Sequence, residues 1–309
     1  MTLFSLLIVM ALERVTTKSK HFHIATLAEQ YFDFLIDKKW LKSDVSMLAV
    51  IVLAIIPSLV AYLLIVLLPS LLVFFIQLLV LWVCLGCPVT RQTYKRYLQA
   101  AHREDFQACS LHSMSFGNEG GQLSTVGKQL VLVNYRQYAS VIIFFIVLGV
   151  PGVVFYSLIK EWVLFEKRQS KQSKTMPTES DAQDPDSSQD ISEFSELNDQ
   201  AAEVRPVNDQ NTSAAQLLFI LDWIPVRITA FGFLIVGHFS NALSAWFEII
   251  IHPNISTYDA LAKVSKAAED VGDCDAHLNE PLQLVKLVKR NIVFMLVALS
   301  LMTMVGLVA

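Results

Sequence analysis

One acidic and one basic side chain lie five residues apart inside an apolar stretch of this chain. Asp222 and Arg227 are the only charged residues between Ala214 and Gly237. A charged side chain within a membrane segment is costly unless it pairs or meets water, so such a residue is a candidate for function. We therefore expect these two residues to form either a structural ion pair or part of a functional polar site.

The same stretch also carries the signal for a helix start. Asp222 can accept hydrogen bonds from free backbone N–H groups, and Pro225 would then fall in the first turn, where its missing N–H is harmless. The sequence therefore predicts a break near Ile220–Asp222 and a new helix over about Trp223–Val236. The segment from Leu217 onwards is expected to be a membrane span or a re-entrant hairpin.

Further side chains can contribute to such a site. Asn134, Tyr135 and Arg136 stand just before a strongly apolar segment. Their ordinary role would be anchoring at the bilayer edge, and their functional role would be an anion site, because a guanidinium group pairs well with carboxylate or phosphate. His238 is either a polar helix cap or a titratable member of the site. Glu13-Arg14 follows a short apolar helix and can join the same polar cluster.

Cys84 and Cys87 have the spacing of a metal or redox motif. No second cysteine pair and no histidine stands near them in the sequence, so a zinc site is not supported. We predict no metal ligand, no cofactor and no catalytic residue. The predicted ligand-binding residues are Asn134, Tyr135, Arg136, Asp222, Arg227 and His238.

Composition points to a membrane protein. The chain has 309 residues, of which 54% are hydrophobic and 17% are charged. Soluble domains carry about 25% charged residues, so this shortfall indicates membrane spans. The net charge is −4, and 12 of the 28 acidic residues lie between Lys160 and Ser213. This distribution lacks the clustered positive charge of a nucleic-acid site, so we expect no nucleic-acid partner.

The same properties divide the chain into three portions. Residues 1–165 form an N-terminal membrane portion, residues 166–213 an acidic linker, and residues 214–309 a C-terminal membrane portion. The linker is rich in Ser, Asp, Gln and Glu. It cannot bury enough apolar surface to offset chain entropy, and we predict that it is disordered.

The pattern predicts an all-α, polytopic membrane protein with four to five spans and interfacial amphipathic helices. Val45–Leu67 and Ser70–Leu85 are predicted to form a tight transmembrane hairpin with Pro69 at its turn. Tyr138–Ile159 is a further span, which Gly149–Gly152 should kink. The other predicted helices are Thr2–Leu12, the amphipathic Ile24–Leu41, the polar Thr90–Leu111, soluble helices within Phe239–Val271, and a helix from Pro281 through Arg290 into the apolar Ile292–Ala309.

Several longer motifs point to one family. They are Tyr94-x-x-Tyr97-Leu98-x-Ala100-Ala101, Asn134-Tyr135-Arg136-x-Tyr138, Asp222-Trp223-Ile224-Pro225-Val226-Arg227 and Ala242-Leu243-x-Ala245-Trp246-Phe247. Through them the chain resembles the AmpE family, inner-membrane proteins associated with regulation of β-lactamase induction. The resemblance covers nearly the whole length except the acidic linker.

That family is in turn similar to the CbiB/CobD membrane enzymes of cobalamin synthesis, which join an amino alcohol to a corrinoid carboxylate. Ile224-Pro225-x-Arg227-Ile228-Thr229-Ala230 resembles a stretch of those enzymes. The enzymes, however, follow their kinked Pro-Gly span with an arginine and an Asn-Thr-Leu-Asp run. Here Pro151-Gly152 leads instead to Ser157-Leu158-Ile159-Lys160. The resemblance therefore implies a shared fold and an anion-holding pocket, and it argues against amide-forming activity.

These resemblances imply an accessory sensor or modulator in the bacterial inner membrane, linked to β-lactamase induction and cell-wall recycling, rather than an enzyme. A polar pocket at the membrane surface is expected to hold an anionic small molecule through Arg136 and Arg227, with Asp222 orienting Arg227. Membrane lipid and a second copy of the chain are the other expected partners. The alternatives are a CbiB/CobD-like amide-forming enzyme and a transporter or lipid-binding scaffold, which broken helices at Gly149–Gly152 and Ile220–Asp222 would suit.

Overall fold

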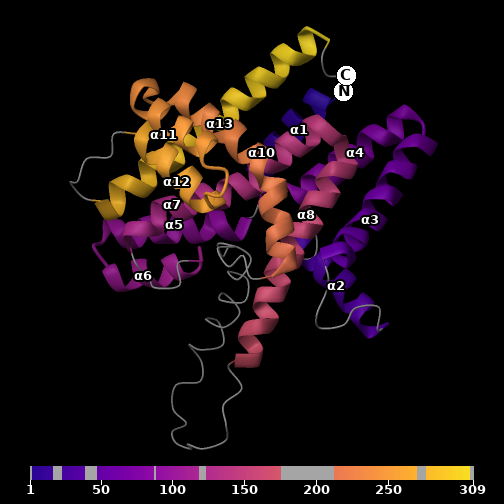
Figure 1. Cartoon of the computed structure of the whole chain (residues 1–309), viewed down its shortest axis with the longest axis horizontal. Coiled ribbons are helices and arrows are strands. Elements are labelled where there is room, and N and C mark those ends of the chain that lie inside the picture. The colour runs from indigo at the N-terminus through magenta and orange to yellow at the C-terminus, as the bar shows by residue number, and fades with distance from the viewer. Residues whose placement is uncertain are drawn as a thin grey trace, which may run out of the picture.

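The computed structural model describes residues 2–16, 23–38, 47–86, 88–117, 123–174, 212–269 and 276–306. Most of the predicted acidic linker (175–211) and residues 39–41 of the predicted amphipathic helix lie outside the described residues. Every regular element of the described ranges is helical, which confirms the predicted all-α class (Figure 1). The helices are α1 (Thr2–Val15), α2 (Ile24–Asp37), α3 (Met47–Leu67), α4 (Ser70–Cys84), α5 (Pro88–His102), α6 (Phe106–Met114), the short η2 (Leu123–Thr125), α7 (Val126–Asn134), the π-helical η3 (Tyr135–Ala139), α8 (Ser140–Lys174), α10 (Ser213–Val236), α11 (Phe239–Ile251), α12 (Thr257–Ala268) and α13 (Ala276–Met304).

Four helices of the described ranges are long and apolar enough to cross a membrane. The chain is therefore a multi-pass membrane protein, as its composition predicts. The four lie in the ranges Met47–Leu67, Ser70–His102, Leu123–Gln169 and Ser213–Val236. The second range contains α4 and α5, and the third contains η2, α7, η3 and most of α8. The last apolar stretch, from Ile292, forms the end of α13 as predicted, and α13 is not among these four.

The predicted hairpin of α3 and α4 has the expected turn, but its two helices do not pack along each other. α3 ends at Leu67, and Pro69 precedes α4 in an extended conformation, so the turn lies where the sequence places it. From this turn the two helices find different partners, because α3 packs along α8 whereas α4 packs on α1 and α8. The prediction that the two spans pack tightly against each other was therefore wrong. Both helices gain more by packing on α8 than on one another.

The predicted kink in the third span is confirmed. Gly149 has φ 68° and ψ −155°, a left-handed conformation that glycine adopts without steric cost. Pro151 follows and has no backbone N–H to continue the helical hydrogen bonds. α8 therefore consists of two helical segments that meet at an angle.

Two predicted helix boundaries were wrong. The polar helix expected over Thr90–Leu111 is divided into α5 and α6, because Glu104 takes a positive φ of 57° and Asp105 Oδ1 accepts a hydrogen bond from the Ala108 N–H at 3.0 Å, which caps α6. In the C-terminal portion, α13 begins at Ala276, so Pro281 lies inside this helix rather than at its start. The predicted continuation of α13 through Arg290 is confirmed.

The predicted break near Ile220–Asp222 was also wrong. α10 runs without interruption from Ser213 to Val236, with Pro225 inside it. Its N-cap is Thr212, whose Oγ1 accepts a hydrogen bond from the Ala215 N–H at 3.3 Å. The helix begins at Ser213, more than two turns before Asp222. Asp222 therefore lies in the helix interior, and its side chain projects sideways instead of capping a helix end.

α2 packs as an amphipathic helix against the protein. Its buried residues Ala28 and Phe32 lie four residues apart on one face, and the Phe32 ring meets Trp162 of α8 edge-on at 4.9 Å between centroids. On its polar side, Glu29 pairs with Arg168 of α8. The amphipathic pattern thus serves a helix–helix contact, and the predicted position of this helix on the bilayer surface stays a prediction.

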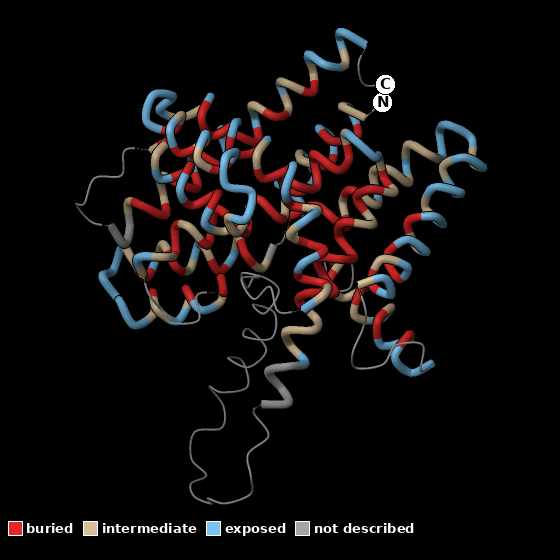
Figure 2. The backbone as a smooth tube through the Cα atoms, in the orientation of Figure 1, coloured by how far each residue is buried: buried red, intermediate tan, exposed pale blue. Residues whose placement is uncertain are grey.

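Buried side chains concentrate where η3, α8 and α10 meet, whereas much of α3 is exposed (Figure 2). The largest cluster extends from α1, α4 and η3 to α11–α13, and a second joins α2, α3, the second segment of α8 and the start of α10. A third lies between α5, α6 and α7. The exposed apolar residues of α3 suit a helix that faces lipid.

Glu13 anchors α1 to the corner between α4 and α5. Its Oε1 accepts a hydrogen bond from the Tyr138 hydroxyl at 2.5 Å, and its Oε2 lies 2.6 Å from Arg91 Nη2. Arg91 also donates to the Glu13 carbonyl and to the Tyr138 hydroxyl, each at 3.0 Å. Gly86, at φ 73°, leaves the space for this carboxylate, since a Cβ there would lie 1.8 Å from Glu13 Oε1.

We predict that Gly86→Ala destabilises the protein more than Gly306→Ala. Both positions have positive φ, so both substitutions carry a backbone cost of about 1–2 kcal/mol. Only position 86 adds a collision with the Glu13 carboxylate, which should cost roughly 1–3 kcal/mol more. Thermal unfolding of the two variants in detergent checks this, and equal midpoints would contradict it.

Candidate functional site

One fully buried carboxylate lies at the centre of a polar cluster among the spans. Asp222 of α10 has 0% of its surface exposed. Its Oδ1 accepts hydrogen bonds from the hydroxyls of Tyr135 and Tyr156, each at 2.9 Å. Tyr135 precedes the Gly149 kink and Tyr156 follows it. A single carboxylate oxygen therefore joins η3 and the second segment of α8 to α10.

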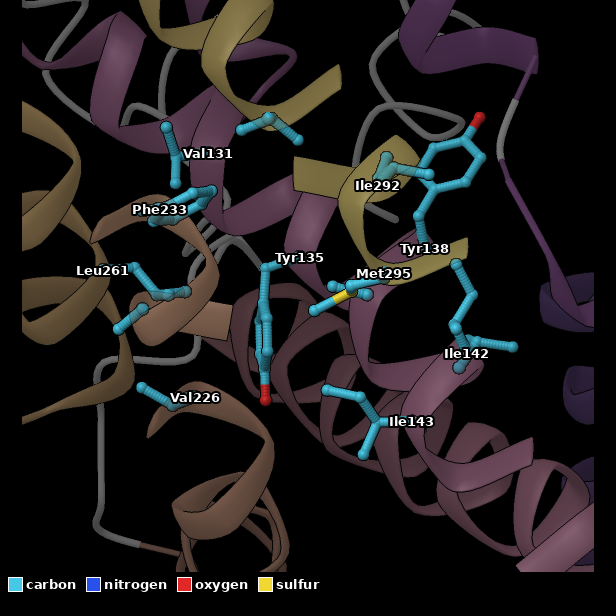
Figure 3. Packing of buried hydrophobic residues seen from close by; sticks show 14 of the residues in the cluster. Val131, Tyr135, Tyr138, Ile142, Ile143, Val226, Phe233, Leu261, Ile292 and Met295 are labelled. Atoms are coloured by element: carbon cyan, nitrogen blue, oxygen red, sulfur yellow. The ribbon is translucent and has the colours of Figure 1, made fainter. Parts of the chain in front are cut away.

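A turn of π-helix sets the direction of these side chains. In η3 the Tyr135 carbonyl accepts hydrogen bonds from the Ser140 backbone N–H and, at 3.0 Å, from its hydroxyl. Such a turn fits an extra residue into the helix and is frequent at functional sites. Figure 3 shows the hydroxyls of Tyr135 and Tyr138 pointing in opposite directions. One segment thus supplies a donor to Asp222 and another to Glu13.

Arg136 faces the other oxygen of Asp222. Its Nη2 lies 3.9 Å from Asp222 Oδ2, and only 9% of the residue is exposed. Among the described residues, neither Asp222 Oδ2 nor Arg136 Nε has a hydrogen-bond partner. A guanidinium group has five N–H donors in a planar arrangement. Arg136 is therefore a buried cation with unused donor capacity beside a carboxylate.

Lys160 and Glu161 add a second pair of charges. Lys160 Nζ lies 3.0 Å from Glu161 Oε1, both residues are buried, and Lys160 is also within electrostatic range of Asp222. The two cations, Arg136 and Lys160, balance the two carboxylates of Asp222 and Glu161, so the cluster is formally neutral. Sequence reasoning did not include Lys160, Glu161 or Tyr156 in the site. The available signal was a charged pair directly after the predicted third span.

Arg227 belongs to a different contact, so the predicted Asp222–Arg227 pair was wrong. The Arg227 guanidinium lies 3.9 Å from the ring centroid of Trp223 and donates to the Trp223 and Ile249 carbonyls at 2.9 and 3.0 Å. Five residues of α-helix rotate a side chain by about 140°. Asp222 therefore faces α8 and η3, whereas Arg227 faces the end of α11.

Two further predicted site residues also lie apart from the cluster. Asn134 donates to the Leu130 carbonyl of its own helix at 2.7 Å. His238 is exposed, precedes α11 and donates from its backbone N–H to the Ala268 carbonyl at 2.7 Å. The predicted role of Glu13 in the same cluster was wrong too, because Glu13 pairs with Arg91 and Tyr138. The fold thus brings together Tyr135, Arg136 and Asp222, and ligand binding by any of them stays a prediction.

The chemistry available at this cluster is charge pairing and hydrogen bonding. In the part of the chain that the structure describes, no three His, Cys, Asp or Glu side chains gather closely enough to hold a metal ion. The cluster offers two cations, two carboxylates and two tyrosine hydroxyls within the buried interior. Such an arrangement can bind an anionic group at its cations or change its internal pairing.

Comparisons with known proteins agree with the sequence motifs. A family profile described as "Regulatory signalling modulator protein AmpE" matches residues 1–182 and 198–309. The chain is also 24% identical to Protein AmpE of Shigella flexneri over 321 residues, which covers 99% of each chain. No solved structure matches. The further similarity to CbiB/CobD enzymes is not shown by these matches and stays a prediction.

We predict that a double-mutant cycle will couple Asp222 to Arg136 and not to Arg227. Asp222→Asn leaves Arg136 as an uncompensated buried cation and should cost about 3 kcal/mol. Adding Arg136→Gln should recover part of this loss, with a coupling energy of about 0.5–3 kcal/mol. Arg227→Gln should add to Asp222→Asn within about 0.5 kcal/mol. Unfolding in detergent provides the free energies, and coupling to Arg227 instead would overturn the pairing.

Proposed function

The chain belongs to the AmpE family of regulatory signalling modulators, and we propose from this that it modulates β-lactamase induction, and with it the response to cell-wall recycling, from within the bacterial inner membrane. In this proposal the chain is a sensor or modulator rather than an enzyme. Its working part is the polar cluster around Asp222, and the signal is an anionic small molecule that binds at Arg136.

The observation that carries this proposal is the incomplete pairing of Arg136. Its guanidinium is nine-tenths buried, makes no hydrogen bond to the described residues and lies 3.9 Å from its nearest carboxylate oxygen. A buried cation is stabilised when acceptors satisfy its donors. A carboxylate or phosphate of a ligand would supply these acceptors in bidentate geometry.

Binding at Arg136 can be transmitted because Asp222 joins η3 to the second segment of α8 across the kink. An anion that pairs with Arg136 competes with Asp222 Oδ2 and weakens its hold on the cation. The remaining contacts of Asp222 are the Tyr135 and Tyr156 hydroxyls from the two sides of the Gly149 kink. A ligand that favours one arrangement of this kink shifts the population toward it by its difference in affinity.

This mechanism differs from the one expected from the sequence in the residues that it uses. Arg227 is occupied by Trp223 and the end of α11, so Arg136 alone contacts the ligand. Asp222 orients Arg136 rather than Arg227. Lys160 is the second cation within reach of the cluster.

The test compares Arg136→Gln with the matched Arg227→Gln in cells that lack the native protein. Arg136→Gln should change β-lactamase induction about fivefold or more, because it removes the cation through which binding is coupled to the spans. Arg136→Lys keeps the charge but loses the bidentate geometry. Its level of induction should therefore lie between that of the wild type and that of Arg136→Gln. Arg227→Gln should leave induction close to that of the wild type.

Native mass spectrometry of the purified variants separates binding from folding. The wild type and Arg227→Gln should retain a small molecule that Arg136→Gln loses. Thermal midpoints establish that each variant is folded. If folded Arg136→Gln induces normally, or retains the same small molecule, the proposal is wrong.

A further inference from the structure

The outward face of α13 changes character half-way along the helix. Side chains three or four residues apart lie on one face of an α-helix. The exposed residues of α13 follow this spacing, first as cations and then as apolar side chains: Lys286, Lys289, Arg290, Val293 (54% exposed), Val297 (53%), Leu301 (59%) and Met304 (82%). Basic and apolar residues therefore form one continuous stripe.

The opposite face of α13 packs against α7 and α10. Leu284, Leu287 and Leu299 are fully buried in the main cluster. At the level where the stripe changes from basic to apolar, the buried Asn291 donates to the Thr229 carbonyl at 3.4 Å. Gly232 makes room for it, since a Cβ there would lie 2.0 Å from Asn291 Oδ1. These contacts set the rotation of α13 and with it the direction of the stripe.

Two of the cations in the stripe have no counter-charge among the described residues. Arg290 forms an ion pair with Glu269, the residue that follows α12. Lys286 and Lys289 are exposed, and neither has an ion pair with any residue that the structure describes. Lysine side chains have long apolar stems and a charged end, so they reach phosphate groups readily from a helix surface.

We propose that this stripe of α13 binds the bilayer itself, with Lys286 and Lys289 on anionic phospholipid headgroups and Val293, Val297, Leu301 and Met304 among the acyl chains. The four membrane-crossing helices place the chain in a bilayer. Lys289 and Val293 are four residues apart, which is about 6 Å along a helix and corresponds to the step from headgroup to hydrocarbon. In Figure 1 the C-terminal part of α13 projects beyond its neighbours, and Figure 2 shows much of it exposed.

A second copy of the chain is a less suitable occupant of this face. A symmetric dimer would use the same stripe on both subunits. It would bury the lysines of both copies without counter-charges, which is costly. Lipid phosphates supply these counter-charges, and each basic residue near an anionic surface contributes about fivefold in affinity.

The first experiment measures lipid preference in the full-length protein. Equal amounts of phosphatidylglycerol and phosphatidylcholine are added to the purified protein, and native mass spectrometry counts the lipids retained. The wild type should favour phosphatidylglycerol, and Lys286→Gln with Lys289→Gln should reduce this preference about fivefold for each charge removed. The control, Lys95→Gln with Arg103→Gln, removes two exposed cations elsewhere and should retain it. An unchanged preference in the first double variant would overturn the proposal.

A second experiment places the apolar part of the stripe. A nitroxide label on Val297→Cys, in a background whose native cysteines are replaced by alanine, is exposed to oxygen and to a water-soluble nickel chelate in bilayers. Lipid contact predicts access for oxygen and shielding from nickel, whereas a label on Lys286→Cys should meet nickel. A label on Val297→Cys that is shielded from both reagents would indicate a second copy and sink the proposal. Access for nickel would sink it equally.

Discussion

Burying the Asp222 carboxylate among apolar helices is the constraint on which the centre of this structure depends. An isolated charge there would be prohibitively costly, so the surrounding helices must supply donors and a counter-charge. Tyr135 and Tyr156 donate to one oxygen and Arg136 faces the other. Removing Arg136 leaves the buried carboxylate without its nearest counter-charge, and removing either tyrosine leaves Oδ1 with one hydroxyl donor. The positions of η3, α8 and α10 relative to one another are therefore linked through a single side chain.

The local irregularities of the chain make this arrangement possible. The π-helical turn η3 directs Tyr135 toward Asp222 and Tyr138 toward Glu13, while the left-handed Gly149 bends α8 between Tyr135 and Tyr156. A straight α-helix could not bring donors so far apart in sequence to one oxygen atom. A regulator needs two arrangements of similar free energy. The Arg136–Asp222 ion pair is long and incompletely hydrogen-bonded, and it lies beside a helix kink. Such a network can support two arrangements of this kind.

Much of the architecture could be predicted because it follows from composition and local chemistry. The charge-free run before Leu85 required membrane helices, Pro69 required a turn, and Gly149 with Pro151 required a kink. The site was only partly predictable. Asp222 and Arg136 were identified as costly charges at the ends or centres of apolar runs, yet their pairing was not, because their separation in sequence is 86 residues and no local pattern reports such a contact.

The sequence by itself determined the class, the turns, the kink and the family, since these depend on hydrophobicity, on proline and glycine chemistry and on motifs read along the chain. Tertiary structure alone decided which charges meet. Asp222 and Arg227 are close in sequence but point about 140° apart on one helix, so Asp222 pairs with Arg136 and Arg227 with Trp223. It also decided that Asp222 is no helix cap, because tyrosine hydroxyls from neighbouring segments satisfy its carboxylate better than its own backbone does.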